Sequence, residues 1–321
     1  MSILGYGDYR YELDDSWPKI PEGWTIGQGA DKLGSKSEKK GSTFLGVSDV
    51  AVDSEDRVFV LNRDAHPIVV FEGNSGQFVT SWGENEFKEP HGIHIDKEDN
   101  VWTTDRQDHV VVKYTKYGEK LTEIGERGWA NSSVTPYGTE NFIGGPFCMP
   151  AGVTIASTGA IFVADGYGNR QVHRFSSSGE LELSWGISGT GPGEFALVHN
   201  VDVDSKDRVY ICDRENSRVQ IFDYDGNFIE EWRDVLNPGD IHCDRQNLVY
   251  VAEQGTPTGV APNGISIFSE SGELVSRFRG RDKGFSQPHG ISTDSRGNIY
   301  TAELSSPEYG GGKTVLKFAK I

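Results

Sequence analysis

Residues 198–222 read VHNVDVDSKDRVYICDRENSRVQIF, and variants of this stretch return along the whole chain. The stretch begins with an alternating apolar run, turns after an aspartate, and continues with two further alternating runs. A period of two residues is typical of half-buried β-strands, because successive side chains of a strand point to opposite faces. Units of the same form begin at residues 47, 90, 150, 238 and 288. We therefore expect six repeats, each with at least three strands.

Most units add a fourth, amphipathic run after a glycine-containing turn, as in GQFVTSWG at 76–83 and GELELSWG at 179–186. Four strands in a repeat of about 40–50 residues are typical of a β-propeller blade. The sequence thus predicts an all-β, six-bladed β-propeller formed by one domain, 1–321. After an N-terminal arm at 1–45, the expected blades lie at about 46–83, 88–125, 146–186, 194–233, 236–280 and 285–321.

The last repeat has no fourth run before Ile321. The segment PEGWTIGQG at 21–29 resembles the outer strands of the other units. We expect the N-terminal arm to supply the missing outer strand and so to close the ring, which leaves no long unpaired sheet edge.

The composition restricts the partners of the chain. Its formal net charge of −17 argues against nucleic acids and anionic membranes, which attract basic surfaces. Three cysteines without regular spacing form no disulfide framework. No leader-like start and no apolar run of about 18–20 residues is present. We expect a cytoplasmic protein that acts on a small molecule, and the sequence does not indicate its oligomeric state.

Three histidines recur at one repeat position. His91, His199 and His289 each lie five residues before the residue that ends the first strand of the second, fourth and sixth repeats. First strands line the channel of a propeller, and alternate blades of six are related by a third of a turn. A lone histidine is usually structural or solvated, but three at one alternating position indicate a divalent metal site. Zinc is the first expectation, although iron, manganese, cobalt and copper also accept imidazole.

The intervening repeats carry small residues at the same position: Ser48, Ala151 and Gly239. They would leave room for a substrate, and Ser48 is a candidate substrate contact. His94 and His242 lie three residues beyond the channel position. Because an odd step along a strand reverses the face, we expect both in the blade packing.

Loops that follow the second strands reach the rim where the first strands begin. They contain Arg63, Arg106, Tyr167 and Arg214. Arginine binds carboxylates in a bidentate manner, but arginines of such repeats also tie blades together. We favour the structural role for Arg106, leave Arg214 open between the two roles, and assign functional roles to Arg63 and Tyr167.

These residues resemble a known family. The repeats resemble NHL propellers, and the histidine constellation resembles the catalytic core of peptidyl-α-hydroxyglycine α-amidating lyase, over about residues 45–318. That family has a six-bladed propeller with a zinc ion held by three histidines, and it cleaves the C–N bond of a peptidyl hydroxyglycine to give a peptide amide and glyoxylate. The resemblance implies zinc ligands at His91, His199 and His289.

The resemblance also implies roles for other residues. Arg63 in LNRDAH matches the functional arginine of the family, Tyr167 in VADGYGN matches its catalytic tyrosine, and DREN at 213–216 matches a segment with an arginine near the site. Two positions depart from the pattern. Gly290 replaces an aspartate that helps to bind a structural calcium ion, which argues against calcium, and Gly168 replaces the cysteine that would pair with Cys148.

The sequence therefore predicts a metal-dependent lyase for a small carbinolamine or related carboxylate. In this interpretation Arg63 holds the substrate carboxylate and Tyr167, surrounded by positive charge, acts as the base. Two alternatives stay open. The same metal could activate water in a hydrolase of an ester, lactone or amide, or the chain could be a non-catalytic NHL scaffold. The long connections 126–147 and 304–313 contain Trp129, Tyr137, Phe142 and Tyr309, as a lid or as local packing.

Overall fold

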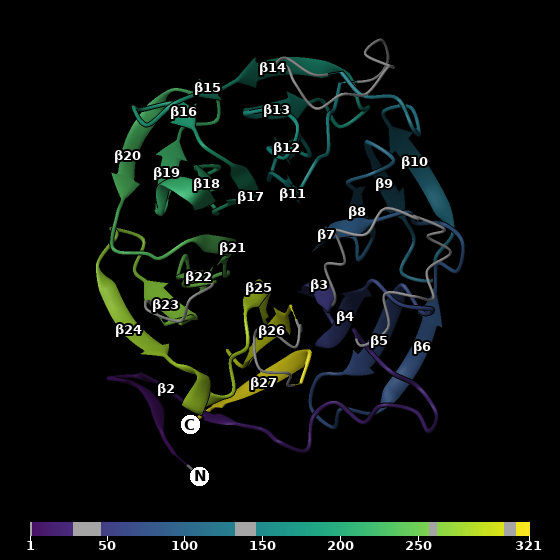
Figure 1. Ribbon diagram of the computed structural model, residues 1–321, viewed down its shortest axis with the longest axis vertical. Coiled ribbons are helices and arrows are strands. Elements are labelled where there is room, and N and C mark those ends of the chain that lie inside the picture. Colours follow the sequence, from purple (N-terminus) through teal and green to yellow (C-terminus); the bar gives the residue numbers. More distant parts are fainter. Residues whose placement is uncertain (1, 28–45, 132–145, 257–261, 305–312) are drawn as a thin grey trace.

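The computed structural model describes residues 2–27, 46–131, 146–256, 262–304 and 313–321. Six sheets stand around a central axis like the blades of a propeller (Figure 1), which confirms the predicted architecture. In each of the first five blades the chain runs outward from the axis through four antiparallel strands. None of the helices in the described ranges is long and apolar enough to cross a membrane.

The first five blades share the same strand order, and their bounds follow. Blade one contains β3 (Val47–Val52), β4 (Arg57–Asn62), β5 (Ile68–Glu72) and β6 (Phe78–Trp82). Blade two contains β7 (Pro90–Ile95), β8 (Val101–Asp105), β9 (Val110–Tyr114) and β10 (Lys120–Ile124). Blade three contains β11 (Gly152–Ile155), β12 (Ile161–Asp165), β13 (Gln171–Phe175) and β14 (Leu181–Trp185). Blade four contains β17 (Val198–Val203), β18 (Val209–Asp213), β19 (Arg218–Phe222) and β20 (Phe228–Trp232). Blade five contains β21 (Pro238–Cys243), β22 (Val249–Glu253), β23 (Gly264–Phe268) and β24 (Leu274–Arg279).

The sixth blade is completed by the N-terminal arm. Its own strands are β25 (Pro288–Thr293), β26 (Ile299–Glu303) and β27 (Val315–Lys320), and the arm adds β2 (Tyr9–Leu13) and β1 (Leu4–Tyr6). Strand β2 pairs antiparallel with β27, with Leu13 opposite Phe318. Closure by an N-terminal outer strand is thus confirmed, but the strand lies earlier in the chain than 21–29.

The segment 21–27 forms no strand because Gly23 and Gly27 adopt left-handed φ angles of 81° and 69°. It crosses blade one instead. The indole of Trp24 stacks on His66 with ring centroids 3.5 Å apart, and the Gly27 N–H donates to Asn62 Oδ1 over 2.9 Å.

The turns between the first and second strands link neighbouring blades. Each contains one residue with positive φ: Asp56, Asp99, Gly159, Asp207, Asn247 or Gly297. Where this residue is aspartate or asparagine, its side chain accepts hydrogen bonds from a serine of the preceding blade: Ser54 to Asp99, Ser157 to Asp207, Ser205 to Asn247 and Ser295 to Asp56. Where it is glycine, the preceding blade has Lys97 or Arg245 in place of serine. The acceptor and its donor therefore occur together or not at all.

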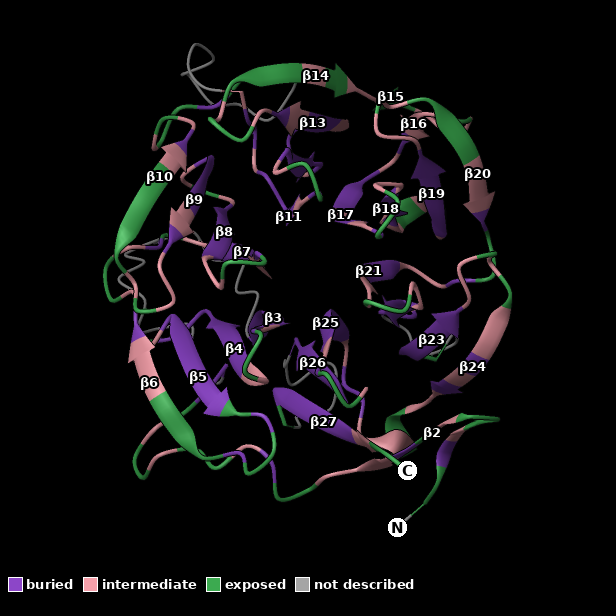
Figure 2. Ribbon diagram, turned by 180° about the vertical axis from the view of Figure 1, so that it is seen from behind, coloured by how far each residue is buried: buried purple, intermediate pink, exposed green. Residues whose placement is uncertain are grey.

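Apolar side chains of adjacent sheets form the core. One cluster joins Phe59 and Val70 of blade one to Val110 and Tyr114 of blade two, and similar clusters lie between other neighbouring blades. Figure 2 shows the inner strands largely buried and the outermost strands β6, β10 and β14 partly exposed. The rigid inner strands are those that present side chains to the axis.

The closing strand should contribute strongly to stability. Tyr11 of β2 is fully buried and lies 5.5 Å from the Phe278 ring of blade five. We expect Tyr11→Ala to lower the free energy of unfolding by about 3–5 kcal/mol, as for other buried aromatics. Chemical denaturation measures this loss. The control is Tyr6→Ala on β1, whose side chain is 47% exposed; equal losses in the two variants would show that β2 does not close the ring.

Candidate metal centre

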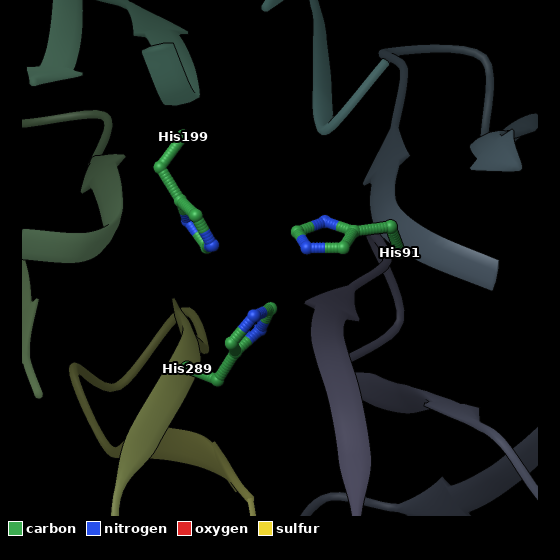
Figure 3. Close-up of side chains that lie close together, drawn as sticks. All are labelled: His91, His199 and His289. Carbon is green, nitrogen blue, oxygen red and sulfur yellow. The ribbon is translucent and has the colours of Figure 1, made fainter. Parts of the chain in front are cut away.

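Three imidazoles meet on the axis (Figure 3). His91 on β7, His199 on β17 and His289 on β25 are each at most 3% exposed, and their ring centroids lie 4.8 to 5.0 Å apart. One ligand atom from each of them lies within 4.8 Å of the other two. Alternate first strands therefore bring three nitrogen donors to one point.

In the three blades that carry a channel histidine, an acidic residue at the end of the second strand sets the height of that histidine. Asp105 accepts the backbone N–H groups of Lys88 and Glu89, just before His91. Asp213 holds the segment before His199 and Glu303 the segment before His289 in the same way. Because these carboxylates fix the backbone two and three residues before each histidine, the three rings lie at one level.

Backbone carbonyls of the intervening blades orient the rings. The Nδ1 atoms of His91, His199 and His289 lie 2.9, 2.5 and 2.5 Å from the carbonyl oxygens of Ala151, Gly239 and Ser48. A carbonyl only accepts, so each Nδ1 carries the proton and each Nε2 keeps its lone pair for a metal.

Ser48 was expected to contact the substrate, but its contacts lie within the protein. Its hydroxyl donates to the Leu61 carbonyl oxygen over 3.1 Å, and the residue is fully buried. Its carbonyl orients His289, and its side chain does not face the cavity as a substrate contact would.

The histidines are held neutral, the form that binds metals. Burial lowers the pKa of His91 well below its ordinary value, and the positive charges of His289 and His199 would lower it further. Burial has the same effect on His199 and His289. Three neutral imidazoles with Nε2 atoms on one axis fit a divalent transition metal such as zinc.

The prediction for His94 and His242 is wrong. Both line a cavity of about 140 Å³ in the channel beyond the histidine ring. The register of β7 against β8 shifts between Pro90 and Ile93, and β21 against β22 shifts between Pro238 and Asp240. A bulge adds one residue to a strand and so reverses the alternation beyond it.

The predicted rim residues surround a second cavity, of about 230 Å³, on the other side of the ring. Its walls include His289, Tyr167 and five of the residues that directly follow a second strand: Arg63, Arg106, Arg214, Gln254 and Leu304. The structure thus brings all the arginine and tyrosine candidates to one place.

Tyr167 reaches the histidine trio. Its hydroxyl oxygen lies 3.0 Å from His91 Nε2 and 2.9 Å from His199 Nε2. Arg214 Nη1 lies 3.5 Å from the same oxygen. The preceding Gly166 allows this approach, since a Cβ atom there would lie 1.9 Å from the Val198 carbonyl oxygen.

The three arginines differ in their partners. Arg106 forms an ion pair with Glu89, and its guanidinium carbon lies 4.5 Å from the centre of the Tyr167 ring. Arg214 pairs with Glu215 over 2.9 Å. Arg63 is 7% exposed and donates from Nε to the Pro90 carbonyl oxygen, but no carboxylate of the described residues lies within 4.0 Å of it. It is the guanidinium best placed to accept a carboxylate from outside.

Sequence reasoning missed Gln254. It occupies the same repeat position as Arg63, Arg106 and Arg214, one residue after the second strand, and this alignment could have found it. Tyr137, Phe142 and Tyr309 lie outside the described residues, and Trp129 is 38% exposed.

The comparisons with known proteins agree with this architecture. A family described as "6-bladed beta-propeller" matches residues 151–294. Peptidyl-alpha-hydroxyglycine alpha-amidating lyase 1 of Drosophila melanogaster is 31% identical over 74% of the chain and 47% of its own length. The chain is a six-bladed β-propeller similar to the amidating lyases.

Other relatives extend the picture. Peptidylglycine alpha-amidating monooxygenase of Rattus norvegicus is 30% identical over 85% of the chain, which spans only 30% of that protein's length. NHL repeat-containing protein 3 of Homo sapiens is 27% identical over 97% of the chain and 84% of its own length. The propeller thus resembles both a named lyase and a repeat protein whose name states no activity.

A carboxyl pair lies one residue below the histidine level. Asp49 and Asp240 are buried, and each accepts a backbone N–H group from its own strand. Each also accepts one from the first strand of the next blade, donated by Ile93 and Ile291 respectively. Burial raises the pKa of Asp49 to about 7 and that of Asp240 in the same direction. A Cβ atom at Gly290 would lie 2.2 Å from Asp49 Oδ1, so glycine is needed there. Among the described residues only the histidine trio forms a candidate metal group. The expectation that Gly290 argues against a structural calcium ion stays untested.

The metal content of the protein should depend on each histidine. Elemental analysis of the purified wild type should find about one transition ion per chain, because three ligands define one site. We expect His289→Ala to lose most of it. His66→Ala, which removes a histidine at the edge of blade one, is the matched control; an unchanged ion content in His289→Ala would contradict the site.

The carboxyl pair should make metal-free protein less stable as the pH rises. The pKa of Asp49 is about 7 in the folded protein, against an ordinary value of 3.8 for the unfolded chain. This difference lowers the free energy of unfolding by on the order of 4 kcal/mol once Asp49 is ionised. This loss of unfolding free energy is absent below pH 4, grows as Asp49 of the unfolded chain ionises, and is complete above pH 7. We expect Asp49→Asn to remove this part of the pH dependence.

Thermal unfolding of both proteins at pH 5 and pH 8, after dialysis against a chelator, measures the effect. The buried histidines act in the opposite direction in both proteins, so the difference between the two proteins is compared. Parallel changes in melting temperature would show that Asp49 does not titrate in this range.

Proposed function

We propose that the protein is a metal-dependent lyase that cleaves N-acyl-α-hydroxyglycine-type carbinolamines into a primary amide and glyoxylate. One observation carries the proposal: the Tyr167 hydroxyl lies within 3.0 Å of two metal-facing nitrogens, in a cavity that the unpaired Arg63 also lines. The similarity to a relative named as an α-hydroxyglycine amidating lyase supports it.

The cavity favours an anionic substrate. Three guanidinium groups line it, although the chain as a whole carries a formal net charge of −17. Glu89 and Glu215 offset the charges of Arg106 and Arg214. The buried Arg63 is left to bind the substrate carboxylate, for which a guanidinium offers two parallel N–H donors.

Tyr167 is the proposed base. A divalent ion on the three histidines would lower the pKa of a hydroxyl group placed beside it. The oxygen of Tyr167 takes the proton of the substrate hydroxyl. Arg214 Nη1 lies 3.5 Å from this oxygen, and the Arg106 guanidinium lies over the tyrosine ring. As the C=O bond of glyoxylate forms, the C–N bond breaks, and the amide nitrogen receives the proton from Tyr167. No oxidant or water is consumed.

We include in the same proposal a zinc ion, a small-molecule substrate and a cytoplasmic location. We also propose that the protein has no nucleic-acid or membrane partner.

A hydrolase on the same site is the second candidate, because the cavity would also accept water next to the histidines. A scaffold without a ligand would have no use for three buried imidazoles whose Nε2 atoms converge.

Substitution of Tyr167 should separate chemistry from metal binding. We expect Tyr167→Phe to lower kcat on N-benzoyl-α-hydroxyglycine by about 10²–10⁴-fold, as for the loss of a general base. Its zinc content should stay unchanged. Tyr117→Phe, on a side chain that is 75% exposed, is the control. Full turnover in Tyr167→Phe would remove the tyrosine from the mechanism.

The products distinguish the two candidate reactions. In water labelled with oxygen-18, a lyase releases benzamide without solvent oxygen, whereas hydrolysis of the amide releases benzoate that contains it. We expect benzamide, and mass spectrometry of the acyl product decides the question. Labelled benzoate as the main product would favour the hydrolase.

A further inference from the structure

A glutamine whose amide nitrogen has no hydrogen-bond partner among the described residues lies in the wall of the substrate cavity. Gln254 directly follows β22 in blade five, and its backbone N–H donates to the Asn237 carbonyl oxygen over 3.1 Å. The preceding Glu253 accepts the Leu236 N–H and forms an ion pair with Arg279. The position of Gln254 is therefore fixed by the same device that sets the histidines.

The side chain lies beside the histidine ring. A Cβ atom at Gly239 would lie 2.7 Å from Gln254 Nε2 and 3.0 Å from its Cγ, so the glutamine occupies the space that a side chain at Gly239 would need. The carbonyl of that same Gly239 accepts the Nδ1 proton of His199. The amide of Gln254 therefore lies next to a residue that orients a metal ligand, and it lines the cavity together with Arg63 and His289.

This amide nitrogen has no hydrogen-bond acceptor among the described residues, although Gln254 is only 8% exposed and the nitrogen itself is buried. An unsatisfied buried donor destabilises the fold, because it has lost its hydrogen bonds to water without gaining another. Such groups are rare in folded proteins outside sites where a ligand supplies the partner. The missing partner of Gln254 is thus expected in the cavity.

We propose that Gln254 binds the acyl oxygen of the substrate and thereby selects N-acyl carbinolamines. This inference rests on the proposed lyase function. Carboxylates are matched by the charged guanidinium of Arg63, whereas a neutral amide N–H matches a neutral carbonyl oxygen. The substrate offers one such oxygen, on the acyl group next to the nitrogen that leaves.

The contact would also assist the reaction. When the C–N bond breaks, its electron pair moves to the amide nitrogen and is shared with the acyl oxygen as an imidate. A donor aimed at that oxygen stabilises the developing charge, as an oxyanion hole does. The nitrogen then takes the proton held by Tyr167, and the neutral amide leaves.

Binding of two unreactive acids to the zinc-loaded protein tests the inference. 4-Oxo-4-phenylbutanoate retains the carboxylate and the acyl oxygen of N-benzoylglycine, and 4-phenylbutanoate replaces the C=O by CH₂. We expect wild type to bind the oxo acid about tenfold more tightly, the range of one net hydrogen bond. In Gln254→Met, which keeps length and shape, the preference should fall below about twofold.

Calorimetric titration measures the four dissociation constants, and zinc content and melting temperature verify that the variant is folded. Gln246→Met, on an exposed turn, is the matched control and should keep the preference. A preference that persists in Gln254→Met, or that is absent from wild type, overturns the role of Gln254.

Turnover of N-benzoyl-α-hydroxyglycine separates this inference from the proposed function. Turnover without any preference between the two acids would leave the lyase intact and remove Gln254 from recognition. A preference that depends on Gln254 in a protein without lyase turnover would leave acyl recognition intact and remove the reaction.

Discussion

The geometry of the channel depends on one repeated interaction, in which a side chain at the end of each second strand accepts the backbone N–H groups that precede the first strand. In five blades this side chain is a carboxylate, and in blade one it is Asn62, which holds Gly27 of the N-terminal arm. Burial raises the pKa of Asp105 and brings that of Glu303 to about 7, so the charged form is costly. In return, the first strands that carry the three histidines are held at equivalent positions by backbone bonds two and three residues before each histidine.

The central ring uses large and small residues in alternation. A histidine from one blade needs the space beside the small residue of the next, and it also needs that residue's carbonyl oxygen for Nδ1. The small residues therefore do more than leave room. Because a backbone carbonyl serves equally well from alanine, glycine or serine, the three positions differ in residue type and share one function.

Much of this could be predicted from the sequence, because comparison between repeats cancels local irregularities. His91, His199 and His289 each lie within the same bulge of their strand, so their alignment is unaffected by it. Counting residues along a single strand, in contrast, gives the wrong face beyond a bulge. The predicted positions of His94 and His242 are wrong for that reason. Gln254 shares a repeat position with three arginines, but only the structure shows that its amide nitrogen lacks a hydrogen-bond partner among the described residues. The closing strand was misplaced because the proline and glycines of 21–27 interrupt a pattern that Tyr9–Leu13 keeps intact.

The pairing of β2 with β27 has a consequence for the order of assembly. These strands come from opposite ends of the described chain, and the last metal-facing imidazole belongs to the blade that they complete. During synthesis, His91 and His199 are made with the second and fourth blades, before the sixth blade that carries His289. A nascent chain can therefore stack its sheets one after another, but the three-nitrogen cluster is complete only when the ring closes.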